Sequence, residues 1–387
     1  MKVDKSKWVE LTFSQIATSQ LGKTLDANKN KGLPYPYLCA ANVGMGYFNL
    51  SNVKEILLED SELEKYIVRK GDLLICEGGD TGRCAIWESE EPIYYQNALH
   101  RVRFNDDIYN RFIMYYLHYY KKVGIIDKLS HGQTIKHFTQ KGLSKLSFRM
   151  PLISEQKGIA SELDALQNMI EGYKAQIADL EKLAKSIFFK MFGDPVVNNK
   201  GWKLTKLSKE GTIIGGATPK TSEPQNWDDG IHNWVTPAEL KGEKFYGSTL
   251  KKITDFALEH CNLTLLPVGT VLLSSRAPIG KVAITTEPMY CNQGFKNIVC
   301  GENLNNEYLY YYLLLNNEEL NRRGNGVTFK EISKKIVEEF PLILPPLNLQ
   351  QEFASQIQVI DRQKDLVQDQ LSDAEQLMAE RMQYYFS

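Results

Sequence analysis

The second half of this 387-residue chain repeats the first half at a nearly constant offset. The pairs that lie 194 positions apart are Gly132/Gly326, Thr134/Thr328, Lys136/Lys330, Pro151/Pro345, Gln156/Gln350, Ala160/Ala354 and Phe192/Phe386. Nearer the start of each copy the offset drifts, to 198 for Gly71/Gly269 and Gly82/Gly280 and to 196 for Leu117/Leu313. Two copies are too few for a solenoid, and each is long enough to bury its own core. The sequence therefore predicts a duplicated domain.

Composition is that of an ordinary globular protein, with 43% hydrophobic and 24% charged residues. The six cysteines form no C-x-x-C pair and have no histidine at zinc-finger spacing, which favours a reduced protein without a disulfide or zinc scaffold. No run approaches the ~20 apolar residues that span a bilayer, and the first residues lack an apolar signal core. We therefore expect a cytoplasmic protein with no membrane partner.

Charge is close to balanced overall, with a net charge of −1, but it is unevenly distributed. Residues 128–149 hold five basic residues, two histidines and no acid. The segment is either a local basic surface or a solvated lysine-rich loop, and its composition fits both.

Each copy ends in a long heptad pattern, in which apolar residues alternate in steps of four and three. The first seam is Ile159, Leu163, Leu166, Ile170, Tyr173, Ile177, Leu180, Ala184, Ile187 and Met191. The second is Phe353, Ile357, Ile360, Lys364, Val367, Leu371, Ala374, Met378, Arg381 and Tyr385. Lys364 and Arg381 interrupt the second seam; polar residues at such positions specify register or meet a partner.

Connectivity fixes how two such helices would pair. The first helix carries the chain from domain one to domain two, so a second helix that pairs with it runs antiparallel. About 38 residues at ~1.5 Å each give a rod of roughly 57 Å. We expect an α+β fold: two tandem mixed α/β domains, 1–150 and 195–346, separated by an antiparallel two-helix coiled coil formed by 151–194 and 347–387.

Within each domain, β-branched and aromatic runs that end in tight loops predict strands at 72–76 and 270–274. A tyrosine-rich helix follows in each copy, at 113–117 and 308–315. These tyrosines recur at helical spacing beside leucines, which favours a place in the core over a base-stacking platform.

Several short motifs, in this order and duplicated, resemble the specificity subunit of type I restriction-modification enzymes. They are Gly71-Asp72-Leu73-Leu74, Gly132-Gln133-Thr134-Ile135-Lys136, Pro151-Leu152-Ile153-Ser154-Glu155-Gln156, Met191-Phe192-Gly193-Asp194-Pro195 and Pro345 through Phe353. The resemblance implies that each domain is a target recognition domain that reads half of a split double-stranded DNA site. It further implies that the helices are a spacer and a dock for two methyltransferase subunits, joined by restriction subunits.

On this resemblance the chain selects the sequence and binds no cofactor, while partner subunits use S-adenosylmethionine, ATP and Mg²⁺. The residues agree with a chain that is not an enzyme. An adenine methyltransferase needs an Asn- or Asp-Pro-Pro-aromatic segment, and Leu344-Pro345-Pro346-Leu347 lacks the polar group. A loose nuclease pattern, Asp229 with Glu239 and Lys241, has Asn42 in place of Glu239 in the first copy, which speaks against a metal site.

Chemistry and position suggest which residues contact DNA, because Arg and Lys suit guanine edges, Asn and Gln suit adenine edges, and Lys suits phosphates. The candidates are Lys23, Arg83, Gln133, Lys136 and His137 in the first copy, and Lys220, Arg276, Lys281, Asn325 and Lys330 in the second. The paired positions Lys136/Lys330 and Arg83/Lys281 are expected to contact the DNA backbone. Gln96-Asn97 and Asn292-Gln293 fit either a base contact or a strand end.

Apolar helix residues off the heptad seam are expected to form the methyltransferase dock. They are Leu183, Phe188, Phe189, Phe192, Leu377, Met382, Tyr384 and Phe386. The alternative is that they pack on the neighbouring domain. Two other functions remain open: a coiled-coil adaptor that binds proteins, and a self-contained DNA-modifying enzyme.

Overall fold

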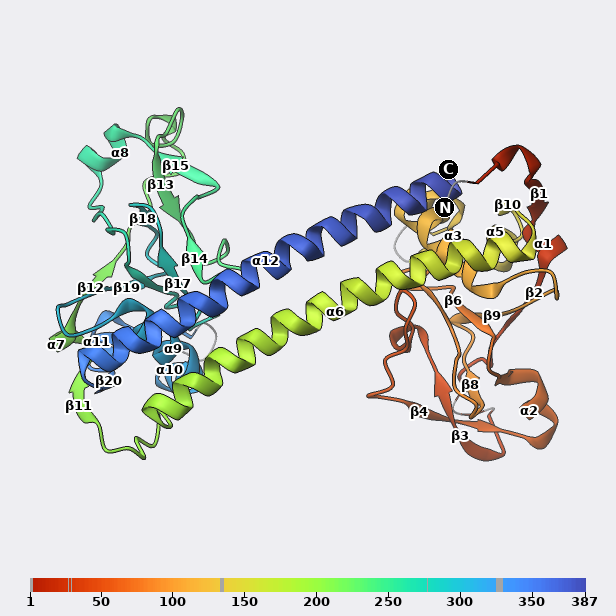
Figure 1. The fold of residues 1–387 in the computed structure, drawn as a ribbon, viewed down its shortest axis with the longest axis horizontal. Coiled ribbons are helices and arrows are strands. Elements are labelled where there is room, and N and C mark those ends of the chain that lie inside the picture. The colour runs from red at the N-terminus through yellow and green to blue at the C-terminus, as the bar shows by residue number, and fades with distance from the viewer. Residues whose placement is uncertain (1–2, 27, 29, 133–135, 277, 325–329) are drawn as a thin grey trace. The chain divides into compact units, whose positions relative to one another are not determined.

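The computed structural model describes residues 3–26, 28, 30–132, 136–276, 278–324 and 330–387. It divides into two compact units, Met1–Lys174 with Asp369–Ser387, and Ala175–Gln368. Each unit contains one globular domain and part of each of two long helices (Figure 1). Within the described ranges, no helix is both long and apolar enough to cross a membrane.

The described residues of the first globular domain form three small sheets. Their strand orders are β2-β9-β6-β7, β4-β3-β8-β5 and the pair β1-β10. The strands are β1 Val9–Thr12, β2 Ala17–Leu21, β3 Leu33–Leu38, β4 Lys54–Leu58, β5 Ile67–Val68, β6 Leu73–Cys76, β7 Cys84–Ile86, β8 Ile93–Tyr95, β9 Leu99–Phe104 and β10 Ser147–Met150. The helices are α1 Phe13–Ile16, α2 Asp60–Tyr66, α3 Asn110–Lys122, α4 Ile125–Leu129 and α5 Gln140–Leu143. Helix α3 packs on β7.

The second globular domain repeats this plan. Its sheets are β12-β19-β16-β17-β14, β15-β13-β18 and β11-β20. The strands are β11 Lys203–Lys206, β12 Gly211–Gly215, β13 His232–Val235, β14 Phe245–Tyr246, β15 Lys251–Ile253, β16 Val271–Leu273, β17 Val282–Thr285, β18 Tyr290–Cys291, β19 Lys296–Cys300 and β20 Pro341–Leu344. The helices are α7 Leu207–Glu210, α8 Asp255–His260, α9 Asn306–Leu315, α10 Asn317–Arg323 and α11 Lys334–Glu338. Helix α9 packs on β17, as α3 packs on β7.

The local predictions for the domain interiors are confirmed. The runs expected to be strands are β6 and β16, and both are buried. The tyrosine-rich segments lie in α3 and α9, where Tyr115, Tyr116 and Tyr308 are buried in the core. The hydroxyl group of Tyr308 donates a hydrogen bond to the carbonyl of Ile343 at 2.8 Å, so the buried polar atom is satisfied.

The two long helices are α6, Ile153–Phe192, and α12, Leu347–Phe386. Both have 40 residues, and their ends lie 194 positions apart, as the sequence repeat requires. Each begins shortly after the predicted proline stop. Gly193, with φ of 77°, follows the end of α6 in a left-handed conformation that suits glycine. The heptad seam is largely buried, from Ile159 and Leu163 in α6 to Phe353 and Leu371 in α12.

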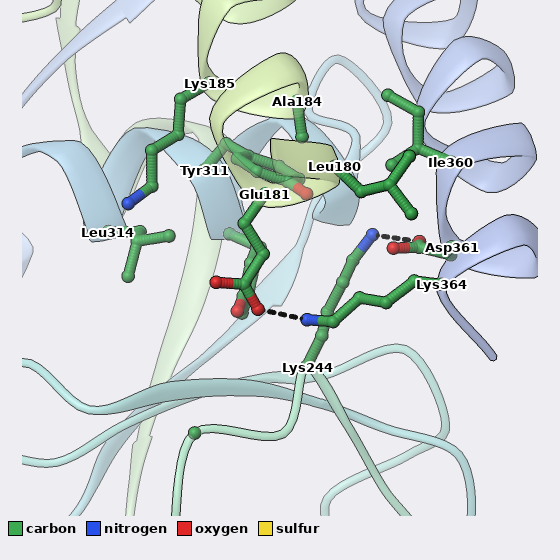
Figure 2. Close-up of a pocket in the computed structure, with 12 residues that line it drawn as sticks. Leu180, Glu181, Ala184, Lys185, Lys244, Tyr311, Leu314, Ile360, Asp361 and Lys364 are labelled. Carbon is green, nitrogen blue, oxygen red and sulfur yellow. Dashed lines mark hydrogen bonds and ion pairs between the residues drawn. The ribbon is translucent and has the colours of Figure 1, made fainter. Parts of the chain in front are cut away.

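Within each unit the two helices pair in opposite directions. In the first unit, Lys174 forms an ion pair with Glu375 at 2.8 Å, and Glu162 pairs with Arg381 at 3.1 Å. In the second unit, Glu181 pairs with Lys364, as Figure 2 shows. The Nε2 atom of Gln356 lies 3.9 Å from the sulfur of Met191. The two charges that interrupt the seam, Lys364 and Arg381, therefore each meet an acid of the facing helix.

Ion pairs also join each domain to the long helices. In the first unit, Arg111 of α3 pairs with Asp164 of α6 at 2.7 Å. In the second unit, Lys244 pairs with Glu307 of α9 and with Asp361 of α12. Its ammonium group is 2.6 Å from the Asp361 carboxylate, the pair drawn in Figure 2. Lys244 borders a pocket of about 180 Å³ between α9 and the two helices. Burial raises the pKa of Glu307, whereas the nearby Lys244 acts in the opposite direction.

Candidate nucleic-acid interface

The loop that follows β6 occupies the same setting as the loop that follows β16. In the first domain, the backbone N–H of Glu77 donates to Ala98 at 2.9 Å, and Phe138 N–H donates to Glu77 at 2.7 Å. In the second domain, Ser275 N–H donates to Gly294 at 2.7 Å and Ile332 N–H donates to Ser275 at 2.9 Å. Each loop therefore lies between a turn that precedes a core strand and the segment that follows the repeated glycine motif.

A glycine closes each of these loops. Gly82 N–H donates to Cys76 at 2.9 Å, and Gly280 N–H donates to Ser274 at 3.0 Å. Both glycines have positive φ, 79° and 88°. A Cβ atom at Gly280 would lie 1.9 Å from the side-chain oxygen of Asn317, so a larger residue would displace the loop. The repeated glycines thus fix the shape of a loop that presents Arg83 or Arg276.

In the first domain, the structure brings most of the predicted DNA-contacting residues to one edge. Arg83 lies in the loop, and His137 is bridged to Gly78 of that loop. Lys136 precedes His137, and both are exposed. The backbone of Lys23 is bonded to Tyr95 and Asn97, next to Ala98, so Lys23 lies at the same edge. Gln133 lies outside the described residues.

The basic side chains at this edge differ in their exposure and in the bonds that they already make within the domain. The guanidinium group of Arg83 donates to the carbonyls of Ala40 at 3.0 Å and Asp80 at 3.3 Å. The ammonium group of Lys23 pairs with Glu62 and is mostly buried. Lys136 is exposed, and no hydrogen bond or ion pair of its side chain occurs among the described residues. Of these three basic side chains, Lys136 is therefore the most accessible, and its contact with DNA stays a prediction.

In the second domain, Arg276 and Lys330 lie together at the corresponding edge. Arg276 is bridged to Glu331 through the backbone, and its Nε lies 3.1 Å from the Glu331 carboxylate. Lys330 directly precedes Glu331 and is exposed. Lys281 does not present its charge in this way, because its ammonium group donates to the carbonyls of Pro237 at 3.0 Å and Leu240 at 2.6 Å. Asn325 lies outside the described residues.

Lys220 is not the structural counterpart of Lys23. The backbone bond from Lys23 to Tyr95 corresponds to the bond from Ala217 to Cys291, so the first domain's lysine is replaced by an alanine. Lys220 pairs with Glu223 at 3.0 Å, and its carbonyl accepts from Trp227 at 3.1 Å. The structure therefore places Lys220 on a separate turn.

Two basic residues next to the loops, the buried His100 and the partly buried Lys296, were not among the predicted contacts. The Nε2 atom of His100 hydrogen-bonds the carbonyl of Phe138 at 2.8 Å, and burial lowers the pKa of this histidine. Lys296, at the corresponding position of β19, lies 3.3 Å from the hydroxyl of Ser275, and burial lowers its pKa too. The two residues differ in type, but the side chain of each hydrogen-bonds a residue of the loop edge, Phe138 or Ser275. Pairing the copies strand by strand would have drawn attention to them.

The carboxylate of Glu239, a member of the loose nuclease pattern, is bonded within its own domain. Glu239 is buried, and its carboxylate accepts hydrogen bonds from Thr236 N–H at 2.9 Å, Leu250 N–H at 2.8 Å and the Tyr246 hydroxyl at 3.0 Å. Asn42 caps the corresponding turn by accepting from Cys39 N–H at 2.9 Å. No group of three or more metal-binding side chains occurs within the described parts of the chain.

The surface predicted to dock a methyltransferase needs a correction. Four of its eight residues are buried: Phe188, Phe192, Met382 and Phe386. They pack inside their own units, where Phe188 stacks on Tyr308 at 5.6 Å and Phe386 lies 5.4 Å from Phe112. The exposed members are Leu183 at 48%, Phe189 at 42%, Leu377 at 41% and Tyr384 at 41%. Partner binding stays a prediction for these four.

The chain is similar in sequence to proteins of known class and similar in fold to a solved structure. Over 382 residues the chain is 26% identical to the putative type I restriction enzyme MjaX specificity subunit of Methanocaldococcus jannaschii, covering 92% of this chain and 86% of that protein. The MjaIX specificity subunit of the same organism is 36% identical over 174 residues, which are 44% of this chain and 39% of that protein. The crystal structure of a type I restriction-modification S subunit from M. genitalium superimposes with a TM-score of 0.60 at 15% identity, covering 100% of this chain and 98% of that one.

One family model, described as the type I restriction modification DNA specificity domain, matches residues 5–182 and again residues 199–376. The two matches begin and end 194 positions apart, in agreement with the repeat. Because they cover most of both copies, the chain belongs to the type I restriction modification DNA specificity domain family.

Proposed function

We propose that this chain is a DNA-recognition subunit that reads a bipartite, asymmetric site, one half with each globular domain. The observation that carries the proposal is the duplicated loop edge. The same backbone bonds hold both loops, and Lys136 and Lys330 occupy matching exposed positions. The neighbouring side chains differ, with His137 in one domain and Glu331 in the other. Shared cations suit phosphates, whereas differing side chains suit base edges.

In this proposal α6 and α12 form an antiparallel coiled coil that sets the spacing between the two half-sites. Support comes from the buried heptad seam and from the ion pairs of Lys364 and Arg381 with the facing helix. Forty residues in each helix correspond to about 60 Å at ~1.5 Å per residue. One turn of B-DNA is about 34 Å, so a spacer of this length suits two separated half-sites.

Catalysis is assigned to partner subunits. Two methyltransferase subunits would use S-adenosylmethionine, restriction subunits would use ATP and Mg²⁺, and this chain would bind none of these cofactors itself. The exposed residues Leu183, Phe189, Leu377 and Tyr384 are proposed contacts for the methyltransferases.

Exchanging one domain tests the division of labour. Residues 1–150 are replaced by the corresponding domain of a relative, and the bound sequence is read out by selection from random duplexes. The proposal expects one half of the site to change and the other half to persist. A change in both halves, or in neither, would contradict it. The affinity of the unmodified chain for its site should also fall steeply as the salt concentration rises. Lysines that bind phosphates displace counterions from the DNA, and this release becomes less favourable in concentrated salt. A protein-binding adaptor would give no such DNA affinity.

A further inference from the structure

The sequence repeat contains a glutamine in the first turn of each long helix, Gln156 in α6 and Gln350 in α12. Neither glutamine is accessible to DNA, because only 1% of Gln156 and 0% of Gln350 is exposed. Their presence in both copies therefore needs another reason. The Oε1 atom of Gln156 accepts a hydrogen bond from Tyr109 N–H at 2.8 Å. Its Nε2 atom donates to the carbonyls of Asp107 at 3.2 Å and Pro151 at 3.0 Å. One side chain thus ties the helix to the turn that precedes α3.

Gln350 makes the same three bonds in the second unit. Its Oε1 atom accepts from Asn305 N–H at 2.9 Å. Its Nε2 atom donates to the carbonyls of Asn303 at 3.1 Å and Pro345 at 2.9 Å. The turn residues themselves differ between the copies, but they meet glutamine only through their backbone. Only an amide both donates and accepts in this way, so neither Glu nor Lys could make the full set.

The residue that follows the turn held by each glutamine is bonded to the segment that precedes a core strand. Asn110, at the start of α3, donates from Nδ2 to the carbonyl of Gly71 at 2.9 Å. Asn306 of α9 donates to the carbonyl of Gly269 at 3.1 Å. Each glycine lies two residues before the strand, β6 or β16, that runs into the DNA-facing loop. In both copies, hydrogen bonds therefore connect the long helix, through this turn, to the start of the strand that leads into the loop.

We propose that Gln156 and Gln350 are positioning residues that fix the angle of each globular domain on its own long helix, and so set the spacer length that the chain accepts between half-sites. This inference rests on the proposed function, because a spacer exists only if the two domains read one DNA molecule. A one-base-pair change of spacer moves a half-site by ~3.4 Å and rotates it by roughly 34°. A rigid junction resists that change, whereas a loosened one accommodates it.

The test uses the full chain and duplexes selected from a random library, which give the half-sites and the preferred spacer. Affinity is then measured on duplexes whose spacers differ from the preferred one by up to two base pairs. The main variant is Gln156→Met, which is similar in volume but makes none of the three bonds. Gln156→Asn is a milder second variant that keeps the amide but shortens its reach. Gln167→Met is the matched control, because Gln167 lies on the same helix and, among the residues that the structure describes, its side chain bonds only the exposed Glu171, at 3.0 Å.

We expect the unmodified chain and Gln167→Met to lose about tenfold in affinity for each base pair of spacer error. In Gln156→Met the preferred duplex should bind about tenfold more weakly, and the loss per base pair should fall to about threefold or less. Gln156→Asn should lie between these limits, which keeps the test decisive should the Met variant fail to fold. A flatter spacer profile supports the inference.

A uniform loss of affinity at every spacer, or no loss, would overturn the inference, because reduced stability alone lowers the active fraction equally for all duplexes. Selection of a single continuous site, or of no site, by the unmodified chain would instead overturn the proposed function. The two failures are therefore distinguishable in one experiment.

Discussion

Replacing Phe188 with alanine should destabilise the second unit strongly, although the sequence pattern alone favoured a place for this residue in a partner interface. Phe188 has no exposed surface. Its ring stacks on Tyr308 at 5.6 Å and meets Phe192 and Phe353 edge-on at 5.1 and 5.6 Å. Removing a buried phenylalanine typically costs ~3–5 kcal/mol, from lost transfer free energy and from the cavity left behind. The aromatic contacts favour the upper part of that range.

The neighbouring residue provides the control. Phe189 is 42% exposed, so Phe189→Ala should change the free energy of unfolding by no more than about 1 kcal/mol. For a cooperative unit of this size, Tm falls by ~2–4 °C for each kcal/mol of stability lost. A loss of ~4–5 kcal/mol in Phe188→Ala should therefore lower the Tm of its transition by roughly 8–20 °C. Calorimetry and urea unfolding followed by circular dichroism measure both effects. Equal losses in the two variants, or a larger loss for Phe189→Ala, would refute the assignment of Phe188 to the core.

Three further predictions concern single side chains. Glu239→Asn should fold, with a free energy of unfolding within about 1–3 kcal/mol of the parent as measured by urea unfolding, because Asn42 caps the corresponding turn of the first domain. A requirement for the Glu239 carboxylate in DNA cleavage or metal binding would contradict this prediction. Lys330→Ala should reduce the slope of log affinity against log salt by about one, because an exposed lysine that contacts a phosphate is lost. Lys281→Ala should chiefly lower stability, because the ammonium group of Lys281 donates to two backbone carbonyls. The reverse pattern would mean that Lys281 contacts phosphate and that Lys330 supports the fold. Burial lowers the pKa of His118 to about 4, below its ordinary 6.5, so the unfolded chain takes up the proton first and stability falls as the pH drops from 6.5 towards 4. The free energy of unfolding should fall by about 1–3 kcal/mol over this pH range, a figure that allows for the partial exposure of His118. In His118→Gln most of this pH dependence should be absent. Equal pH dependence of urea unfolding in the two proteins would count against the prediction.

The long helices were predictable because their signal is local and repeated. Proline stops and a heptad of apolar residues depend only on neighbours along the chain, so α6 and α12 begin within two residues of the predicted positions. The tyrosines of α3 and α9 were assigned to the core by the same kind of periodicity. The subtraction of residue numbers likewise predicted the duplicated domain, and each copy has a core strand at the expected place, β6 or β16.

The partners of individual side chains were not predictable in this way. An apolar pattern indicates that Phe188 and Phe386 are buried, but it does not tell whether their own domain or another protein covers them. Similarly, a lysine in a loop looks the same whether it faces water, as Lys330 does, or holds backbone carbonyls, as Lys281 does. Such contacts depend on residues distant in the chain, and only the folded structure brings them together.

The central claim is that two domains of one chain each read half of a split DNA site. Genome-wide mapping of methyladenine, in cells with the chain and in cells from which it has been deleted, tests this claim most directly. The account predicts that deletion abolishes methylation at one bipartite, asymmetric motif with a fixed spacer. Unchanged methylation, or the loss of a continuous palindromic motif, would contradict it.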